Sequence, residues 1–418
     1  MESFLNKKII SWCLFDFGNS AHSAIIATFI YSVFFARVLY GDEVQGSALW
    51  AQMTGIAALC TALISPFVGE YYDQKDGKKT GVMIFSFITI IATAALFMFE
   101  KGGNSAIYAL IVAGISFFAI EIAVALNNSQ LLDISTKENR GRISGYGWGI
   151  GYIGGLIALI ISLVVFIGLD GMIEPILNLN SDTHENVRAT TLFTAFWYLL
   201  FLIPLLIVFR TKIKGKTVPL KLVINNVKDT FKDLVTLEDK NLMLFLIASA
   251  LYRDGLITLF AVGGLYAAGT FQMSFSEILI FAIGLNIMAG IGAFSFGFIN
   301  DKIGSKKTII ISLIGLILVG IATLIITSKI LFIALALFLG LFMGPCQSAS
   351  RVFMSELSPE HEQAKYFGFY TLTGKSIAFT GPILFGILTS AFDSQRVGML
   401  AVIILLSIGL AILLKVKK

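Results

Sequence analysis

Charged residues, cysteine and histidine are all scarce in this chain. Only 14% of its 418 residues are charged and 56% are hydrophobic, too apolar a composition for a water-soluble protein of this length. Three cysteines in apolar stretches form no disulfide framework, and three scattered histidines offer no metal-binding pair. The composition indicates an integral membrane protein, and we expect no metal site, no cofactor and no enzymatic activity.

The net charge of +5 does not indicate nucleic-acid binding, because the basic residues form no stripe along one helix face. They gather instead in alternate connections between apolar segments. The other connections hold few of them: Arg37, Lys101, Arg188, Lys329 and Arg396. Since Lys and Arg collect in cytoplasmic loops, we predict that both termini are cytoplasmic.

The long apolar segments set the fold class, since a membrane-spanning helix needs about 20 mostly apolar residues. Twelve segments qualify: 9–39, 47–72, 80–99, 105–131, 143–169, 189–210, 241–268, 276–299, 307–327, 329–355, 366–390 and 396–415. We predict an all-α membrane protein with twelve transmembrane helices in two pseudo-symmetric six-helix bundles. The expected domains are 1–210, an amphipathic cytoplasmic linker at 211–240, and 241–418.

An internal repeat relates the two halves. The first set of residues is Gly69, Asp73, Lys78, Lys79 and Thr80, and the second, at one constant spacing, is Gly297, Asp301, Lys306, Lys307 and Thr308. Asp16 and Asp254 match at a slightly different spacing, as loops of unequal length would produce. Because matched segments run in the same direction, the repeat is parallel, which is typical of transporters built from two halves.

The repeated segment ends the second and eighth predicted spans on the cytoplasmic side. There, glycine allows helices to approach closely and the basic residues anchor the loop. We expect Asp73 and Asp301 to accept hydrogen bonds from the free N–H groups of a neighbouring helix start. The glycines, aspartates and paired lysines of this repeat are therefore predicted to gate the cytoplasmic side.

Several ionisable residues lie inside predicted spans, where each costs roughly 2.5–3.5 kcal/mol and is expected to face a wet cavity or a partner. Three are acidic and three are basic: Asp16, Glu121, Asp254, Arg253, Arg351 and Lys375. Polar residues share helix faces with them: Asn19, Ser20 and Ser23 with Asp16, Asn128 with Glu121, and Gln347 and Ser350 with Arg351. We predict a substrate and proton site here; charge pairs that only lock helices together are the alternative.

Motifs of soluble enzymes occur only by coincidence. Gly149, Gly151 and Gly154 have the spacing of a dinucleotide fingerprint, but they lie within an apolar span with no preceding strand. Gly147, Gly151 and Gly155 are spaced by four residues, which predicts a ridge of small residues for close helix packing.

Taken together, these residues resemble the major facilitator superfamily, and more narrowly the vacuole effluxer family, whose eukaryotic members are autophagy-related vacuolar amino-acid exporters. The resemblance is carried by Trp12, residues 15–21, Thr28, Asp254, Gly255, Thr258, residues 347–351, residues 367–370, Gly374, Lys375, Gly381 and Pro382. Phe17, Gly18 and His22 depart from the family pattern, which puts the substrate in question. The resemblance implies alternating-access transport of a small polar solute such as an amino acid, without nucleotide hydrolysis, by a monomer.

Direction and coupling ion stay open at this point, with protons as the candidate. Three other classes of protein could use the same fold: a lipid flippase or scramblase, a membrane-embedded enzyme, and a receptor or sensor. The charged helix faces argue against a lipid pathway, and the scattered histidines argue against an enzyme.

Overall fold

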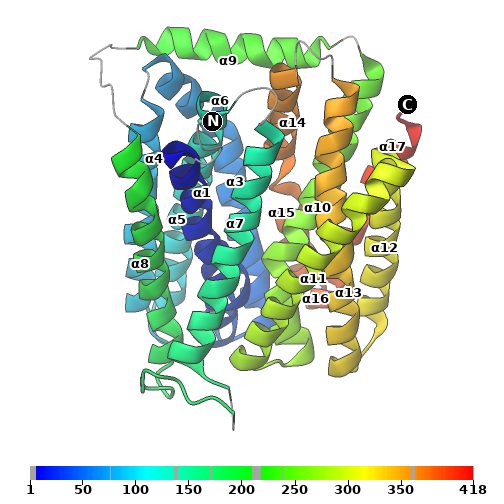
Figure 1. The fold of residues 1–418 in the computed structure, drawn as a ribbon. Helices are drawn as coiled ribbons and strands as arrows, with labels where there is room; N and C mark the ends of the chain where they lie inside the picture. The colour runs from blue at the N-terminus through cyan, green and yellow to red at the C-terminus, as the bar shows by residue number, and fades with distance from the viewer. Residues whose placement is uncertain are drawn as a thin grey trace. The chain divides into compact units, whose positions relative to one another are not determined.

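A computed structural model describes residues 6–75, 77–135, 140–169, 172–209, 218–237, 239–358 and 363–417. Over these residues the regular structure is helical. There are 12 helices long and apolar enough to cross a membrane: Lys7–Tyr40, Glu43–Gln74, Lys78–Met98, Ser105–Ser129, Gly149–Ile167, Glu185–Val208, Lys240–Phe271, Phe275–Gly292, Ser305–Ile325, Lys329–Leu357, Gly368–Phe392 and Gln395–Lys415. The predicted fold class, twelve transmembrane helices without a sheet, is confirmed (Figure 1).

The chain divides into two compact units. The first comprises Met1–Gly41 and Leu63–Lys232, and the second comprises Asp42–Ala62 and Asp233–Lys418. The boundary falls within one long helix, α3 (Glu43–Gln74), whose first part belongs to the second unit. The predicted domains 1–210, 211–240 and 241–418 remain a prediction.

The first unit is an α-helical bundle. Its long helices are α1 (Lys7–Ala21), α4 (Lys78–Ala95), α5 (Ser105–Ser129), α7 (Arg140–Ile161) and α8 (Glu185–Val208). Helix α1 packs against α7 and α8, while α4 packs against α5 and α8. Short segments complete it: a 3₁₀ turn at Leu96–Met98, α6 (Leu131–Ile134) and a π-helical segment at Ser162–Ile167.

The first span is not one regular helix. After α1 it continues as a π-helix over His22–Phe29, α2 (Tyr31–Phe34) and a second π-helix over Phe35–Tyr40. Helices of π type carry one extra residue per turn, so they rotate the residues that follow around the helix axis. Apolar periodicity cannot show this change, because nearly all the residues of the segment are apolar.

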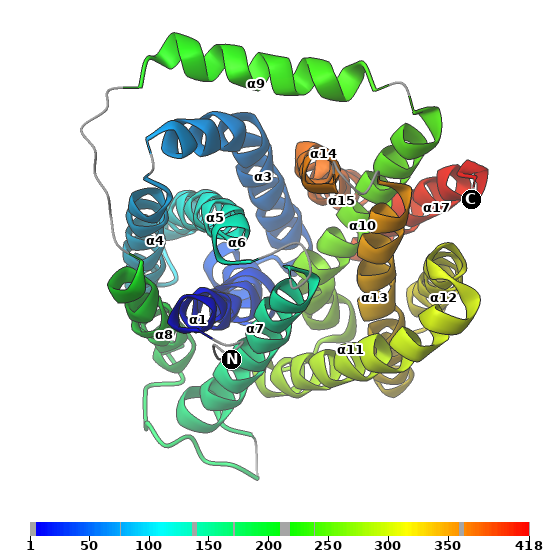
Figure 2. The ribbon, with the colours of Figure 1, turned by 45° about the horizontal axis from the view of Figure 1, so that its top comes forward.

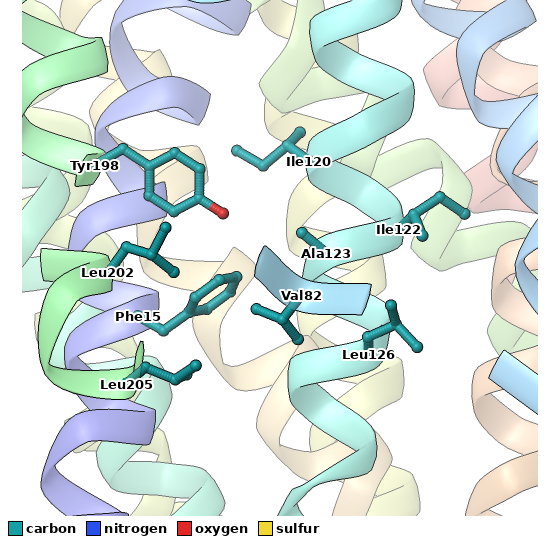
Figure 3. Close-up of a cluster of buried hydrophobic side chains, with 9 residues drawn as sticks. All are labelled: Phe15, Val82, Ile120, Ile122, Ala123, Leu126, Tyr198, Leu202 and Leu205. Carbon is teal, nitrogen blue, oxygen red and sulfur yellow. The ribbon is translucent and has the colours of Figure 1, made fainter. Parts of the chain in front are cut away.

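An apolar cluster fixes the orientation of α1 within the first unit (Figure 3). Phe15 of α1 lies among Tyr198 and Leu202 of α8 and Ile120 of α5, and all four side chains are at most 5% exposed. The rings of Phe15 and Tyr198 meet edge to face, with centroids 5.7 Å apart. With Phe15 buried there, the next residue, Asp16, must project from a different face of the helix.

The second unit repeats these pairings. Its helices are α10 (Lys240–Phe271), α11 (Phe275–Ile303), α12 (Ser305–Ile325), α13 (Lys329–Leu357), α14 (Gln363–Ile377), α15 (Thr380–Phe392), α16 (Gln395–Gly398) and α17 (Leu400–Lys415). Helix α10 packs against α17 and α14, as α1 packs against α8 and α7, and α12 packs against α13, as α4 packs against α5. The eleventh span is broken between α14 and α15.

Helix α9 (Leu220–Val235) lies in the stretch predicted to be an amphipathic linker. Its predicted apolar positions Val223, Val227 and Leu234 are buried, whereas Phe231 is 38% exposed. The Asn226 amide donates a 2.6 Å hydrogen bond to Glu70 of α3. The helix runs crosswise to α1, α4 and α8 (Figures 1 and 2), as expected for a helix lying on a membrane surface.

Candidate functional site

Asp16 lies where α1 meets the glycine ridge of α7. Its Oδ1 accepts a hydrogen bond from the Asn19 amide at 3.3 Å, and the Ser20 hydroxyl binds the Asp16 carbonyl at 2.7 Å. A Cβ placed on Gly147 would lie 3.0 Å from Asp16 Oδ2 and 2.6 Å from the Trp12 ring. Only a glycine allows α7 to approach this carboxylate so closely.

The rest of the ridge follows the predicted spacing at Gly151 but not at Gly155, whose added Cβ would lie an ordinary 3.5 Å from Ser20 Cβ; the next close approach is at Gly154. A Cβ on Gly151 would lie 3.1 Å from Ser20 Oγ, and one on Gly154 would lie 2.7 Å from Phe17 Cα. Gly149, on another face, has no atom within 4 Å of such a Cβ. These glycines therefore serve helix packing rather than phosphate binding.

The predicted polar face of the first span is more exposed than the face that carries Phe15 and His22. Asp16, Asn19 and Ser20 are half-buried and Ser23 is exposed. His22 is 2% exposed; its Nε2 lies 2.7 Å from Ser116 Oγ, which is 2.9 Å from Thr93 Oγ1. Because its hydrogen-bond partners are neutral hydroxyl groups, His22 serves helix packing and interhelical hydrogen bonding.

The polar residues of the fourth span differ in burial. Glu121 is half-buried on α5 and has an interaction partner, but Asn128 is exposed and its neighbour Asn127 is fully buried. The amide atoms of Asn127 and Gln130 have no hydrogen-bond partner among the described residues, while the Asn127 carbonyl accepts a 2.8 Å bond from Trp12 Nε1. The polar sequence around Asn128 was the only available signal for these buried amides.

In the second unit, Arg253 and Asp254 project from α10 in different directions. The Arg253 guanidinium lies over the ring of Tyr370 on α14, 4.2 Å from its centroid, and donates to the Tyr370 carbonyl at 3.0 Å. The carboxylate of Asp254 accepts the backbone N–H of Gly381 at 2.8 Å. Because this N–H lies in the first turn of α15, Asp254 caps that helix from a neighbouring one.

The remaining predicted positions of this unit are half-buried. Gln347 and Arg351 lie on α13, and Lys375 lies near the end of α14. Ser350, between the first two, is buried with its hydroxyl 2.6 Å from Tyr252 of α10. Arg351 and Lys375 both have interaction partners.

The repeated motif is organised around lysines. Lys78 Nζ forms ion pairs with Asp73 at 3.2 Å and with Asp133 at 3.4 Å, so Asp73 binds this ammonium group rather than the backbone N–H groups we expected. The reason is that Lys78 is the first residue of α4 and its side chain reaches back to α3. A Cβ on Gly69 would meet no atom within 4 Å, so Gly69 does not mediate close helix approach here.

The structure shifts the alignment of the two motifs by one residue. Lys79 donates to the Leu206 carbonyl at the end of α8, and Lys306 donates to the Val416 carbonyl at the end of α17, both at 2.6 Å. The structural counterpart of Lys79 is therefore Lys306, whereas the sequence pairs Lys79 with the exposed Lys307. The surroundings of Gly297 and the side chain of Asp301 lie outside what the structure describes.

Two arginines at the opposite ends of these helices were missed. Arg188 of α8 donates to the carbonyl of Phe97 at 2.9 Å and pairs with Glu100, and Arg396 of α16 donates to the carbonyl of Leu324. In each unit, lysine and arginine thus bind the third and sixth spans together at both ends. Their sequence neighbourhoods differ, so motif comparison could not relate them.

The family follows from a comparison with known sequences. The profile of a family described as "Vacuole effluxer Atg22 like" matches residues 35–418. The chain belongs to this family. With its 12 candidate spans, the chain is a transporter of the major facilitator type, as the resemblance implied.

Individual relatives and a solved structure agree with this family. The chain is 24% identical over 417 residues to an uncharacterized MFS-type transporter, YxiO, of Bacillus subtilis, covering 99% of this chain and 95% of that protein. It is 27% identical to autophagy-related protein 22-1 of Neosartorya fischeri over 71% of this chain and about half (51%) of the fungal protein. The inward-open xylose transporter XylE from E. coli shares the fold, with a TM-score of 0.68, 14% identity and coverage of 98% and 96% of the two chains.

Proposed function

We propose that this transporter is secondary active and moves a small polar solute, such as an amino acid, by alternating access coupled to protons. The observation that carries the proposal is the pair Asp16 and Asp254, at matched positions of the two halves. Neither carboxylate forms an ion pair with a described basic residue. An unpaired carboxylate inside a span is costly, so it is retained where it binds a proton or a cationic group.

The surrounding residues suit a zwitterionic solute. Asp16 and Glu121 supply negative charge for an ammonium group or a proton, with Asp254 as a second acidic group. Arg253, Arg351 and Lys375 supply positive charge for a carboxylate. Neutral hydrogen bonds would come from Asn19, Ser23, Asn128 and Gln347.

The repeated motif is proposed to gate the cytoplasmic side. In the first unit, Lys78 holds Asp73 and Asp133 in one charged cluster, and Lys79 fixes the end of α8. Gly69, Gly297, Asp301, Lys306 and Lys307 complete the proposed gate. We place the protein as a monomer in a bacterial inner membrane with both termini cytoplasmic, in agreement with the distribution of basic residues.

Thermal stabilisation of the purified protein tests this proposal, because a ligand that binds only the folded state raises its melting temperature. The panel contains amino acids, dipeptides, pentoses and short-chain phospholipids. We expect a concentration-dependent rise for one class of amino acid or related zwitterion. Stabilisation by phospholipids alone would contradict the proposal and favour a lipid pathway, and a response to none of the solutes would also contradict it.

A further inference from the structure

Asp254 is the most deeply buried acidic side chain among the described residues, with 0% of its surface exposed. One carboxylate oxygen, Oδ2, accepts the Gly381 N–H at 2.8 Å, and the other, Oδ1, has no hydrogen-bond partner. A buried polar atom without a partner is rare and calls for a ligand that the protein alone does not provide.

The surroundings leave little space around this carboxylate. A Cβ on Gly381 would collide with the Thr258 hydroxyl, and a Cβ on Gly255 would lie 3.3 Å from Leu405 and Leu406 of α17. The Thr258 hydroxyl is already bound to the Asp254 carbonyl at 2.8 Å. A metal cation would need several more oxygen ligands here, and the positive end of the α15 dipole disfavours it.

The nearest charges are directed elsewhere. Arg253 is bound to α14 through Tyr370, and the hydroxyl of Tyr252 is bound to Ser350. Among the side chains that the structure describes, the other charged groups on the helices packed against α10 are Lys375 on α14, Lys329, Arg351 and Glu356 on α13, Glu277 and Lys302 on α11, Arg396 on α16 and Lys415 on α17. Glu277 is paired with Lys329, Glu356 accepts from Ser305, and Arg396 donates to Leu324, whereas α15 has no ionisable residue.

We propose that Asp254 is a proton-binding site of the transport cycle and that its charge controls the start of α15. The proton binds Oδ1. The anionic form stabilises the first turn of α15 by accepting the Gly381 N–H and by its favourable interaction with the helix dipole. Neutralisation of the carboxylate weakens both interactions. Because α14 ends at Ile377 and α15 starts at Thr380, the eleventh span has a break at which this change can act as a bend.

This inference rests on the proposed function but is tested without a transported solute. Infrared difference spectroscopy of the full-length protein in liposomes, titrated with acid, detects the carbonyl stretch of protonated carboxyl groups. We expect a band from a dehydrated carboxyl that is absent in Asp254→Asn and retained in Glu277→Gln, a control carboxylate of the same unit that is 40% exposed. The same band in Asp254→Asn as in the wild type would overturn the proposal.

Hydrogen exchange tests whether the charge of Asp254 controls the start of α15. Asparagine resembles the protonated carboxyl in size and charge. In the Asp254→Asn protein, the first-turn amide hydrogens of α15 should therefore exchange about five to ten times faster than in the wild type, as expected from losing a charged helix cap. The wild-type protein should approach this rate as acid neutralises Asp254, after correction for intrinsic exchange. Equal protection in both proteins at neutral pH would overturn control of α15.

A second variant guards against a folding defect. Asp254→Glu keeps the acidic group, so a folded protein of this kind should retain an acid-sensitive carboxyl band, and its absence would count against the site. If the band is found but no solute is taken up, the proton site stands and the proposed transport function fails.

Discussion

Asp16 is held by contacts that leave its carboxylate available. Asn19 donates to one oxygen, and the glycine ridge of α7 leaves room for the other. On another face of α1, Phe15 is packed in the apolar cluster shown in Figure 3. The side chain is therefore positioned by packing rather than by a charge partner, as a binding group would need to be.

Asp16→Asn should reduce transport without unfolding the protein. Asparagine keeps the size and the bond from Asn19 but loses the charge, and a lost charged hydrogen bond lowers uptake by about tenfold or more. Uptake into liposomes measures the effect. The control Asp229→Asn neutralises an exposed carboxylate on α9 and should transport normally. Unchanged, pH-dependent uptake by Asp16→Asn would remove Asp16 from the mechanism.

Gly154→Ala should destabilise the first unit, because the new methyl group would press on the Phe17 backbone of α1. Overpacking of this kind costs about 1–3 kcal/mol, seen as a lower melting temperature. Gly149→Ala is the matched control, because a Cβ on Gly149 would meet no atom within 4 Å. This substitution should be neutral or stabilise the protein by up to about 1 kcal/mol through helix propensity. Equal effects of the two substitutions would show that α1 and α7 do not pack this way.

At the scale of helices, apolar run length predicted all the spans, because crossing a membrane imposes one dominant requirement. The details of each span were not predictable in the same way. The π-helical segments of the first span and the break before α15 depend on tertiary contacts. The burial of Asn127 next to an exposed Asn128 likewise depends on helix rotation, which the sequence does not set to within one residue.

The one-residue shift between the lysine motifs can be tested directly. Lys79→Met and Lys306→Met each remove a hydrogen bond to a carbonyl near the end of the sixth or twelfth span, and each should lower stability by about 1–3 kcal/mol. Lys307→Met should have little effect, because Lys307 is exposed. If Lys307→Met were as destabilising as Lys79→Met, the alignment read from sequence would be correct and the structural one wrong.

At the scale of the whole molecule, α3 joins the two compact units. The unit boundary lies between Ala62 and Leu63, and Pro66 lies within the helix just beyond it. Proline has no N–H to bind the carbonyl four residues earlier, that of Ala62, so the helix is weakened at the boundary. A flexible point at this place in α3 suits the alternating access proposed above.

Pro66→Ala should restore the missing bond and stiffen α3. We expect a slower maximal uptake rate, with a melting temperature that is unchanged or higher. Pro204→Ala is the control, because Pro204 lies inside α8, which belongs to the first unit alone. A normal uptake rate for Pro66→Ala would show that α3 does not bend at this point during transport.

The central claim is that the two repeated halves, each with a carboxylate that forms no ion pair with a described basic residue, make up a proton-coupled carrier. Its most direct test is uptake of the stabilising solute into liposomes that contain the purified protein and a proton gradient, without ATP. The account predicts accumulation above equilibrium that disappears when a protonophore collapses the gradient. Accumulation that needs ATP, or equilibration that ignores the proton gradient, would contradict it.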